Sequence, residues 1–273
     1  MVSFPNAKIN LGLNVTRKRD DGFHDIETVF YPVACCDALE VIAAPNQDQP
    51  YIFTSSGLKV DGNATDNLCI KAYQLLKKDF PSLPAVQIHL HKVIPMGAGL
   101  GGGSADAAFM LKLLDQKFKL QIDKEKLESY ALQLGSDCPF FLTNKPCYAT
   151  GRGELLEPVA VDLSSYSIVL INPGIHVNTG LAFSQLTPAL PDHSLKEIIL
   201  EPVTAWKDRV KNDFEKAVFA MHPAIGEVKD FLYEKSAVYA SMSGSGSTVF
   251  GIFEKNTAPV SFPGKNYFTR VLV

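Results

Sequence analysis

The chain has 273 residues, of which 46% are hydrophobic and 20% are charged, and its formal net charge is −3. This length fits one large domain or a fused pair, and it can bury a sizeable core without disulfides or a structural metal. The slight acidic excess argues against a nucleic-acid-binding protein, because such proteins usually carry a basic excess. A local site for a small anion is compatible with it.

The sequence carries no sign of export or membrane insertion. No apolar run approaches the ~20 residues of a membrane span, and residues 1–6 (MVSFPN) lack the basic and apolar regions of a secretory signal. The five cysteines are odd in number and make no C-x-x-C pair, which favours reduced thiols in the core. We therefore expect a cytoplasmic protein with neither a membrane nor a nucleic-acid partner.

The first hundred residues predict mainly strands. Apolar and polar residues alternate from Ile9 to Thr16, which is the period of a half-buried strand. Further β-rich or alternating runs cover residues 26–33, 39–43, 51–54 and 85–91. Between the last two runs, Asp66 is placed to cap a helix whose apolar stripe extends from Ile70 to Phe80.

The rest of the chain predicts helices interleaved with strands. One helix is expected from Ala107 to Phe118, and a second over 124–134, between an Asp123 cap and a Gly135 stop. Shorter helical segments are expected over 180–186 and 206–220, and strands over 166–171, 237–242, 248–253 and 267–272. Strands followed by this mixture indicate an α+β fold. Glycines and a proline interrupt the pattern near residue 155 and suggest two lobes, residues 1–155 and 156–273.

The strongest local signal is the glycine-rich segment from Pro95 to Asp106, PMGAGLGGGSAD. Glycines remove side chains where a backbone must approach something closely. The N–H groups at the start of the helix that follows favour negative charge. Phosphate is therefore the expected ligand. A flexible linker is the alternative, but linkers do not run into a strongly patterned helix.

The common phosphate-binding loops fit this segment poorly. Gly97, Gly99 and Gly102 satisfy G-x-G-x-x-G, but Pro95 and the mid-chain location do not suit a first βαβ unit. The lysine of a P-loop is missing from the segment, and the sequence landmarks of protein kinases are missing from the chain.

Three motifs in order resemble those of the GHMP kinases, a family of small-molecule kinases. Residues 5–11 (PNAKINL) resemble the first motif, residues 95–105 the second and residues 241–247 (SMSGSGS) the third. The resemblance implies a two-lobed α+β fold, in which an N-terminal lobe like ribosomal protein S5 binds ATP and a ferredoxin-like C-terminal lobe binds the substrate. It also implies ATP and Mg²⁺ as cofactors.

Further residues resemble one branch of this family. They are residues 21–24 (DGFH), 66–68 (DNL) and 134–139 (LGSDCP). That branch transfers the γ-phosphate of ATP to the tertiary hydroxyl of a small-molecule substrate, CDP-methylerythritol, in the non-mevalonate route to isoprenoid precursors. The expected activity is therefore that of a kinase with an alcohol acceptor.

The resemblance implies roles for individual residues. Asp137 matches the catalytic base and Lys8 the lysine beside the acceptor hydroxyl, and such a pair would keep the carboxylate ionised. ATP binding is assigned to Pro95, Met96, Gly97, Ala98, Gly99, Leu100, Gly101, Gly102, Gly103, Ser104 and Ala105, with Asn67, Leu68 and Lys92 on the adenine side. Substrate binding is assigned to Asn10, Phe23, His24, Thr179, Phe183 and Gly244.

Within these sets, some side chains have a more specific expected role. Phe23 and Phe183 are expected to sandwich cytosine, and His24 to read the edge of the base. The Ser104 hydroxyl is expected to reach phosphate or Mg²⁺, or else to cap its helix. Phe23 stands where the family commonly has tyrosine, so any hydrogen bond from that hydroxyl is lost.

Several alternatives are compatible with the sequence. The stretch 254–265 contains two prolines and does not favour the helix that the family usually has there. Both a monomer and a weak homodimer are possible quaternary states. The competing functions are a homoserine or mevalonate kinase, a nicotinamide-dependent oxidoreductase, and a nucleotide-binding regulator without turnover.

Overall fold

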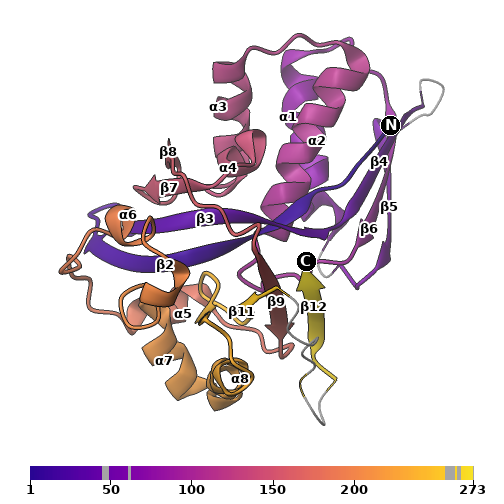
Figure 1. Ribbon diagram of the computed structural model, residues 1–273. Coiled ribbons are helices and arrows are strands. Elements are labelled where there is room, and N and C mark those ends of the chain that lie inside the picture. Colours follow the sequence, from indigo (N-terminus) through magenta and orange to yellow (C-terminus); the bar gives the residue numbers. More distant parts are fainter. Residues whose placement is uncertain (45–48, 61–62, 256–261, 263–265, 273) are drawn as a thin grey trace. The chain divides into compact units, whose positions relative to one another are not determined.

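The computed structural model describes residues 1–44, 49–60, 63–255, 262 and 266–272 (Figure 1). The chain divides into two compact units, which are described separately. Unit 1 consists of residues 1–7, 34–96 and 101–144, and unit 2 of residues 8–33, 97–100 and 145–273. Each unit therefore combines segments that are distant in sequence. Of the helices in the described ranges, none has both the length and the apolar character needed to cross a lipid bilayer.

Unit 1 is a four-stranded sheet packed against helices. Its strands are β1 (Val2–Ser3), β4 (Ala38–Ala43), β5 (Tyr51–Gly57) and β6 (Val86–Lys92), in the order β1-β4-β6-β5. Its helices are η1 (Ala64–Asp66), α1 (Leu68–Asp79), α2 (Gly102–Phe118), α3 (Lys124–Leu134) and α4 (Cys138–Thr143). Strands β5 and β6 are parallel, because α1 crosses between them. Alternate residues of β6 and the apolar stripes of α1 and α2 form the core.

Unit 2 contains two four-stranded sheets. One has the order β2-β3-β7-β8, from β2 (Asn6–Lys18), β3 (His24–Cys36), β7 (Cys147–Thr150) and β8 (Leu155–Pro158), with the first two residues of β2 and the last three of β3 in unit 1. The other has the order β10-β11-β9-β12, from β9 (Tyr166–Asn172), β10 (Tyr239–Met242), β11 (Val249–Glu254) and β12 (Phe268–Leu272).

The helices of unit 2 are α5 (Thr179–Ser184), α6 (Leu195–Ile198), η2 (Val203–Ala205), α7 (Phe214–Met221) and α8 (Pro223–Glu234) (Figure 1). They differ in the sheet they approach: α8 packs on β10 and β11, whereas Lys196 of α6 pairs with Glu157 of β8. Leu13 and Val15 of β2 join Ile171, Val228 and Val249 in one apolar core. Strand β2, which lies in the other sheet, therefore shares a core with the second sheet and its helices.

Most of the predicted elements are present. The α+β prediction is confirmed, and each predicted strand corresponds to an observed one. Helix α3 begins and ends at its predicted residues, and Asp123 Oδ1 accepts from Lys126 N at 2.8 Å as its cap. The last strand, β12, pairs with β9. The expectation for residues 254–265 falls mostly outside the described residues.

Two predictions about helix starts are wrong. The cap of α1 is Asn67, whose side chain accepts from Cys69 N at 2.9 Å, whereas Asp66 ends η1. The helix expected over 206–220 begins only at Phe214. The reason is that the backbone before it pairs with β2: Leu13 N donates to Lys211 O at 2.8 Å, and Asp213 N donates to Leu13 O at 2.9 Å. Helices α4, α6 and α8 have no counterpart among the predicted elements.

Candidate functional site

The polar face of β2 carries the predicted lysine and asparagine. Lys8 and Asn10 are 3% and 1% exposed, although their alternation with apolar residues predicted a solvated polar face. Lys8 Nζ donates to Asn10 Oδ1 at 2.6 Å and to Gly99 O at 3.3 Å, and it lies 4.9 Å from the centre of the Phe30 ring. Asn10 Nδ2 donates to Thr28 Oγ1 at 2.9 Å. The prediction of a half-buried strand is therefore wrong here, because this polar face lies within unit 2.

The three motifs meet in unit 2 around Gly99 and Ser243. The Ser243 hydroxyl accepts from Asn10 N at 3.2 Å and donates to Gly99 O at 2.8 Å. Lys8 N donates to Leu100 O at 2.9 Å. Gly99 has a φ of +77°, and a Cβ at this position would lie 2.0 Å from Ser243 O. Glycine is therefore required where the second motif approaches the third.

The start of α2 brings Ser104 close to Asp137 in unit 1. The N-cap is Gly101, with φ +68°, and Ser104 is the third residue of the helix, so the prediction that Ser104 caps it is wrong. A Cβ on Gly135 would lie 3.4 Å from Cys138 Sγ and 3.9 Å from Ser104 Oγ. Burial raises the pKa of the Cys138 thiol to about 12. Unit 1 therefore places the turn of residues 135–138, which contains Asp137, beside the first turn of α2.

Asp137 occupies the N-cap position of α4, where it is half-buried. Its side chain makes no capping hydrogen bond to that helix. A role as a helix cap, the structural alternative for this carboxylate, is therefore not supported. Lys8 belongs to unit 2, and the pairing of Lys8 with Asp137 stays a prediction.

The predicted adenine-side lysine is buried between two carboxylates. Lys92 is 3% exposed, and its Nζ donates to Asp37 Oδ2 and, at 2.8 Å, to Asp106 Oδ2. Burial raises the pKa of Asp106 to about 7, against the opposing effect of the Lys92 ammonium. Asp106 Oδ1 finds no hydrogen-bond partner among the described residues. The role of Lys92 toward adenine stays a prediction.

The other two adenine-side residues lie at the start of α1. Asn67 caps the helix and Leu68 is its first residue, and both side chains are half-buried. A Cβ on Gly103 would lie 3.7 Å from Leu68 Cδ1. Unit 1 therefore brings Leu68 close to the glycine-rich start of α2, and it gives Asn67 a structural role besides its predicted one.

The predicted cytosine-binding residues lie in unit 2, where two of them contact each other. The His24 ring stacks on Phe183, with centroids 4.6 Å apart and an interplanar angle of 15°. Phe183 also packs edge-on against Phe214 at 4.8 Å. Phe23 is 53% exposed, and the Arg152 guanidinium lies 5.0 Å from its ring centre. The sandwich of Phe23 and Phe183 around cytosine stays a prediction.

Two further substrate residues lie at the third motif. Thr179 Oγ1 and Ser245 Oγ are 2.9 Å apart. A Cβ on Gly244 would lie 3.6 Å from Asn10 Oδ1. Thr179 begins α5, whose N-cap Asn178 accepts from Leu181 N at 2.9 Å. Unit 2 therefore places Asn10, Thr179 and Gly244 around one turn.

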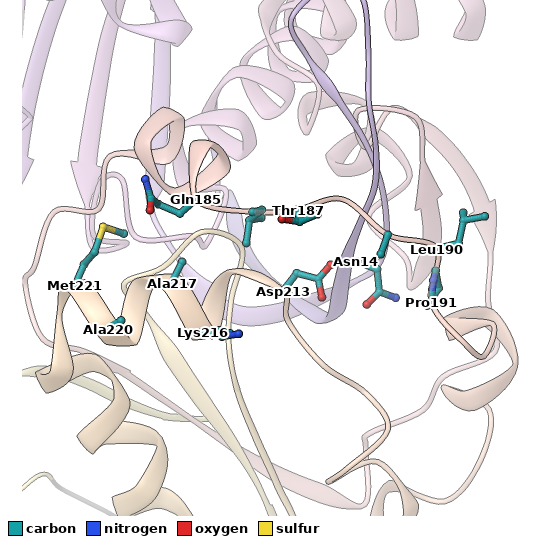
Figure 2. Close-up of a pocket in the computed structure, with 12 residues that line it drawn as sticks. Asn14, Gln185, Thr187, Leu190, Pro191, Asp213, Lys216, Ala217, Ala220 and Met221 are labelled. Carbon is teal, nitrogen blue, oxygen red and sulfur yellow. The ribbon is translucent and has the colours of Figure 1, made fainter.

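A cavity of about 570 Å³ lies elsewhere in unit 2. Figure 2 shows Ala217, Ala220 and Met221 of α7 on one side and Gln185 and Thr187 of the chain after α5 on the other. None of its lining residues belongs to the predicted ATP or substrate sets.

The site residues that were not predicted are polar groups that hold the predicted ones. Ser243 bridges Asn10 and Gly99, and Thr28 accepts from Asn10. Asp37 and Asp106 hold Lys92. Ser243 lies inside the third motif and was within reach of sequence analysis. Asp37 stands alone between two strands, and only the fold brings it to Lys92.

The chain matches known kinases over most of its length. Models of the GHMP kinases N terminal domain and the GHMP kinases C terminal domain match residues 67–145 and 195–260. A 4-diphosphocytidyl-2-C-methyl-D-erythritol kinase of Bacteroides fragilis is 56% identical over 253 residues, which cover 93% of this chain and 92% of that protein.

Solved structures agree with this match. A crystal structure of 4-(cytidine 5'-diphospho)-2C-methyl-D-erythritol kinase has a TM-score of 0.80 and 32% identity, and the match covers 92% of this chain and 90% of that one. The mevalonate kinase of Methanococcus jannaschii has a TM-score of 0.72 at 9% identity over 99% and 97% of the two chains, which shows a shared fold only. The chain therefore belongs to the GHMP kinase family and, within it, to the 4-diphosphocytidyl-2-C-methyl-D-erythritol kinases.

Proposed function

We propose that the chain transfers the γ-phosphate of ATP to the tertiary hydroxyl of 4-diphosphocytidyl-2-C-methyl-D-erythritol. Relatives with that name are 56% and 52% identical over nearly the whole chain. The likeness to mevalonate kinase extends to the fold alone. The chain belongs to a kinase family, so its G-x-G-x-x-G match lies outside the dinucleotide-binding fold that a nicotinamide-dependent oxidoreductase needs.

The observation that carries this proposal is the closeness of Asp137 to the first turn of α2. Phosphoryl transfer is mainly positioning and charge stabilisation. The N–H groups at the start of α2 suit the phosphates of ATP. A carboxylate in the turn beside that helix start is suited to orient the acceptor hydroxyl or to take its proton.

Lys8 and Asn10 support the same reaction from unit 2. The Lys8 ammonium is buried and held by Asn10 Oδ1 and Gly99 O. A buried cation in a site for a polyanion stabilises developing negative charge more strongly than a solvated one. We assign Lys8 to the acceptor oxygen and Asn10 to holding Lys8 and the substrate.

The residues present fit ATP with Mg²⁺. Gly97 and Gly103 are exposed, and an added Cβ at either would lie no nearer than 3.7 Å to a neighbouring group, so glycine leaves bare backbone where phosphates are expected. Mg²⁺ in kinases usually keeps several waters and takes one or two protein oxygens besides the phosphates. The described residues contain no group of three or more His, Cys, Asp or Glu side chains suited to a metal. Ser104 is the residue we assign to Mg²⁺, which when bound neutralises phosphate charge.

The cytidine end of the substrate is assigned to the aromatic residues of unit 2. The His24 ring occupies one face of Phe183 at stacking distance, so a pyrimidine that stacks on this face would take the place of the imidazole. A stacked base contributes roughly 1–3 kcal/mol. We assign Phe183 to base stacking, His24 to the edge of the base and Phe23 to the second face.

The substrate assignment is tested by turnover with three acceptors. The purified chain is incubated with ATP and Mg²⁺ and with 4-diphosphocytidyl-2-C-methyl-D-erythritol, homoserine or mevalonate, and ADP release is measured. We expect phosphorylation of the cytidine compound alone. Turnover of either other acceptor without the first would end the proposal. Binding of ADP with no turnover of any acceptor would favour a regulator.

The role of Asp137 is tested by the isosteric change Asp137→Asn. We expect kcat to fall about 10²- to 10⁴-fold, the usual contribution of a positioned acid or base, with ADP binding retained. ADP binding is measured by the shift in Tm that ADP causes. Asp123→Asn is the matched control, because Asn caps a helix about as well as Asp, and it should leave kcat unchanged. Full activity of Asp137→Asn would remove this residue from the mechanism.

A further inference from the structure

A buried ion triad in unit 1 lies beside the two ends of the glycine-rich segment, residues 95–106. It consists of Asp37, Lys92 and Asp106. Lys92 and Asp37 have 2% and 0% of their side-chain surface exposed, and Asp106 has 5%. The Lys92 ammonium lies between the two carboxylates. Buried charges are expensive to desolvate, and ion triads of this kind are a poor source of stability compared with apolar packing. The triad therefore calls for an explanation other than stability.

The triad holds both ends of the glycine-rich segment. On the side of β6, Asp37 Oδ1 accepts from Val93 N at 2.6 Å and from Ile94 N at 2.8 Å, directly before Pro95. On the side of α2, Asp106 belongs to the second turn of the helix and accepts from Lys92 at 2.8 Å. Lys92 joins these two ends through one ammonium group.

Lys92 also fills the space under the first residue of α2. A Cβ on Gly102 would lie 3.1 Å from Lys92 Nζ and 2.9 Å from Ile94 Cγ2. The ammonium, the end of β6 and the start of the helix are thus packed with no room for a side chain. The direction of the first N–H groups of α2 depends on this packing.

We propose that Asp37, Lys92 and Asp106 are positioning residues, which fix the two ends of the glycine-rich segment so that the start of α2 is preorganised for a nucleoside triphosphate. The inference rests on the proposed function, since it presumes that phosphates bind at this helix start. It differs from the expected contact of Lys92 with adenine, because the triad acts on the loop and has no preference for a base.

The first test separates the two backbone hydrogen bonds that Asp37 accepts from the charge of its carboxylate. Asp37→Ala removes the acceptor of both backbone N–H groups, whereas Asp37→Asn keeps an oxygen that can accept both bonds. We expect Asp37→Ala to raise KM for ATP about 10- to 100-fold, because small misplacements of binding groups have effects of this size, with kcat reduced by a smaller factor. Asp37→Asn keeps these two backbone bonds but loses the oxygen that accepts from Lys92, so its KM should lie between those of Asp37→Ala and the wild type.

A control variant shows how much of any change comes from lost stability. Tyr130 OH donates to Asp79 Oδ2 at 2.5 Å at the far end of α1, in the same unit. Tyr130→Phe should lower Tm and leave KM for ATP unchanged. Folding of each variant is checked by circular dichroism and by Tm.

The second test separates positioning from contact with adenine. Lys92→Met is assayed with ATP and with GTP. A positioning role predicts that KM rises by the same factor for both nucleotides, whereas a contact with adenine predicts a change in the ratio of the two KM values. If Asp37→Ala does not fold, Lys92→Met and Asp37→Asn decide the question by the same readouts.

Three outcomes would overturn the proposal. They are a folded Asp37→Ala with the KM of the wild type, an Asp37→Asn as impaired as Asp37→Ala, or a changed ATP-to-GTP ratio in Lys92→Met. The wild type is assayed first. If it binds ADP but phosphorylates none of the three acceptors, the proposed function fails, and the triad is judged by ADP affinity instead of KM. A wild type that binds no ADP would overturn both.

Discussion

Lys8 shows how a single buried charge can depend on its neighbours. Its ammonium is held by one side-chain oxygen and one carbonyl and lies over the Phe30 ring. The strand pattern alone suggested a solvated lysine, because alternation cannot tell a wet face from a polar face buried by other parts of the fold. The family resemblance places Lys8 beside the acceptor hydroxyl, but its contacts with Gly99 and Asn10 are visible only in three dimensions.

Lys8→Met keeps most of the side-chain volume and removes the charge. We expect kcat to fall about 10²- to 10³-fold, because a preorganised cation aimed at developing charge has effects of this order. Lys18→Met is the matched control at the exposed end of the same strand. Steady-state kinetics with ATP and the cytidine substrate would check this, and equal kcat values for the two variants would contradict it.

Cys147 gives the unfolding free energy a predictable pH dependence. Burial raises the pKa of its thiol to about 12 from an ordinary value of 9.0. The folded state thus keeps its proton longer than the unfolded state. The resulting stability is complete below pH 9 and is lost as the pH rises toward 12, by about 1.4 kcal/mol per pH unit.

This effect is isolated by comparing the wild type with Cys147→Ala. The difference in unfolding free energy between the two proteins should shrink by about 1.4 kcal/mol from pH 8 to pH 10. Other titrating groups cancel in that difference. Urea unfolding at both pH values measures it, and a difference that stays constant would mean that the thiol ionises in the folded state as it does in water.

Helix ends were the least predictable elements of the chain. For α3 the sequence offered one strong cap and one glycine stop, and both are used. For α1, two neighbouring residues, Asp66 and Asn67, are of types that cap helices. Asn67 is the N-cap, because Asp66 is the last residue of η1. Helix α7 starts late, since the backbone before it bonds to β2. Such long-range pairing leaves no local trace in the sequence.

Two glycines with nearly equal backbone angles allow a test of the contact between the second and third motifs. Gly99 (φ +77°) faces Ser243 O, whereas Gly174 (φ +74°) has nothing within 4 Å of an added Cβ. Gly174→Ala should cost about 1–2 kcal/mol from its backbone angle alone. Gly99→Ala should cost more and should also raise KM for ATP. Urea unfolding and kinetics check this, and equal losses of unfolding free energy would contradict it.

At the scale of the whole molecule, the α+β class and the positions of most strands along the chain could be predicted. The grouping of the segments into two compact units could not. Strand periodicity and the glycine signals are local, and they predict every described strand except β1, β7 and β8. The predicted lobes, residues 1–155 and 156–273, follow the order of the chain and stay a prediction as functional divisions. The two compact units cut across that order, because they depend on which distant surfaces pack together.

The grouping of segments predicts how fragments behave. Residues 145–273 lack Leu13 and Val15 of β2, which belong to the apolar core of unit 2. This fragment alone should therefore show no cooperative unfolding transition, while co-expression with residues 1–144 should restore a transition and kinase activity. Circular dichroism during heating measures this. A cooperative transition in the isolated fragment would show that it forms its core without β2.

The passage of the chain between the two units also affects biosynthesis. The chain changes unit after residues 7, 33, 96, 100 and 144. On the ribosome, every segment of unit 1 has been made once Asn144 has emerged, whereas β2 and most of β3 are translated early and lack their partner strand β7 until residues 147–150 are made. The β2–β3 pair thus lacks its neighbouring strand β7 during nearly half of translation. This pair is the segment that a holding chaperone would recognise.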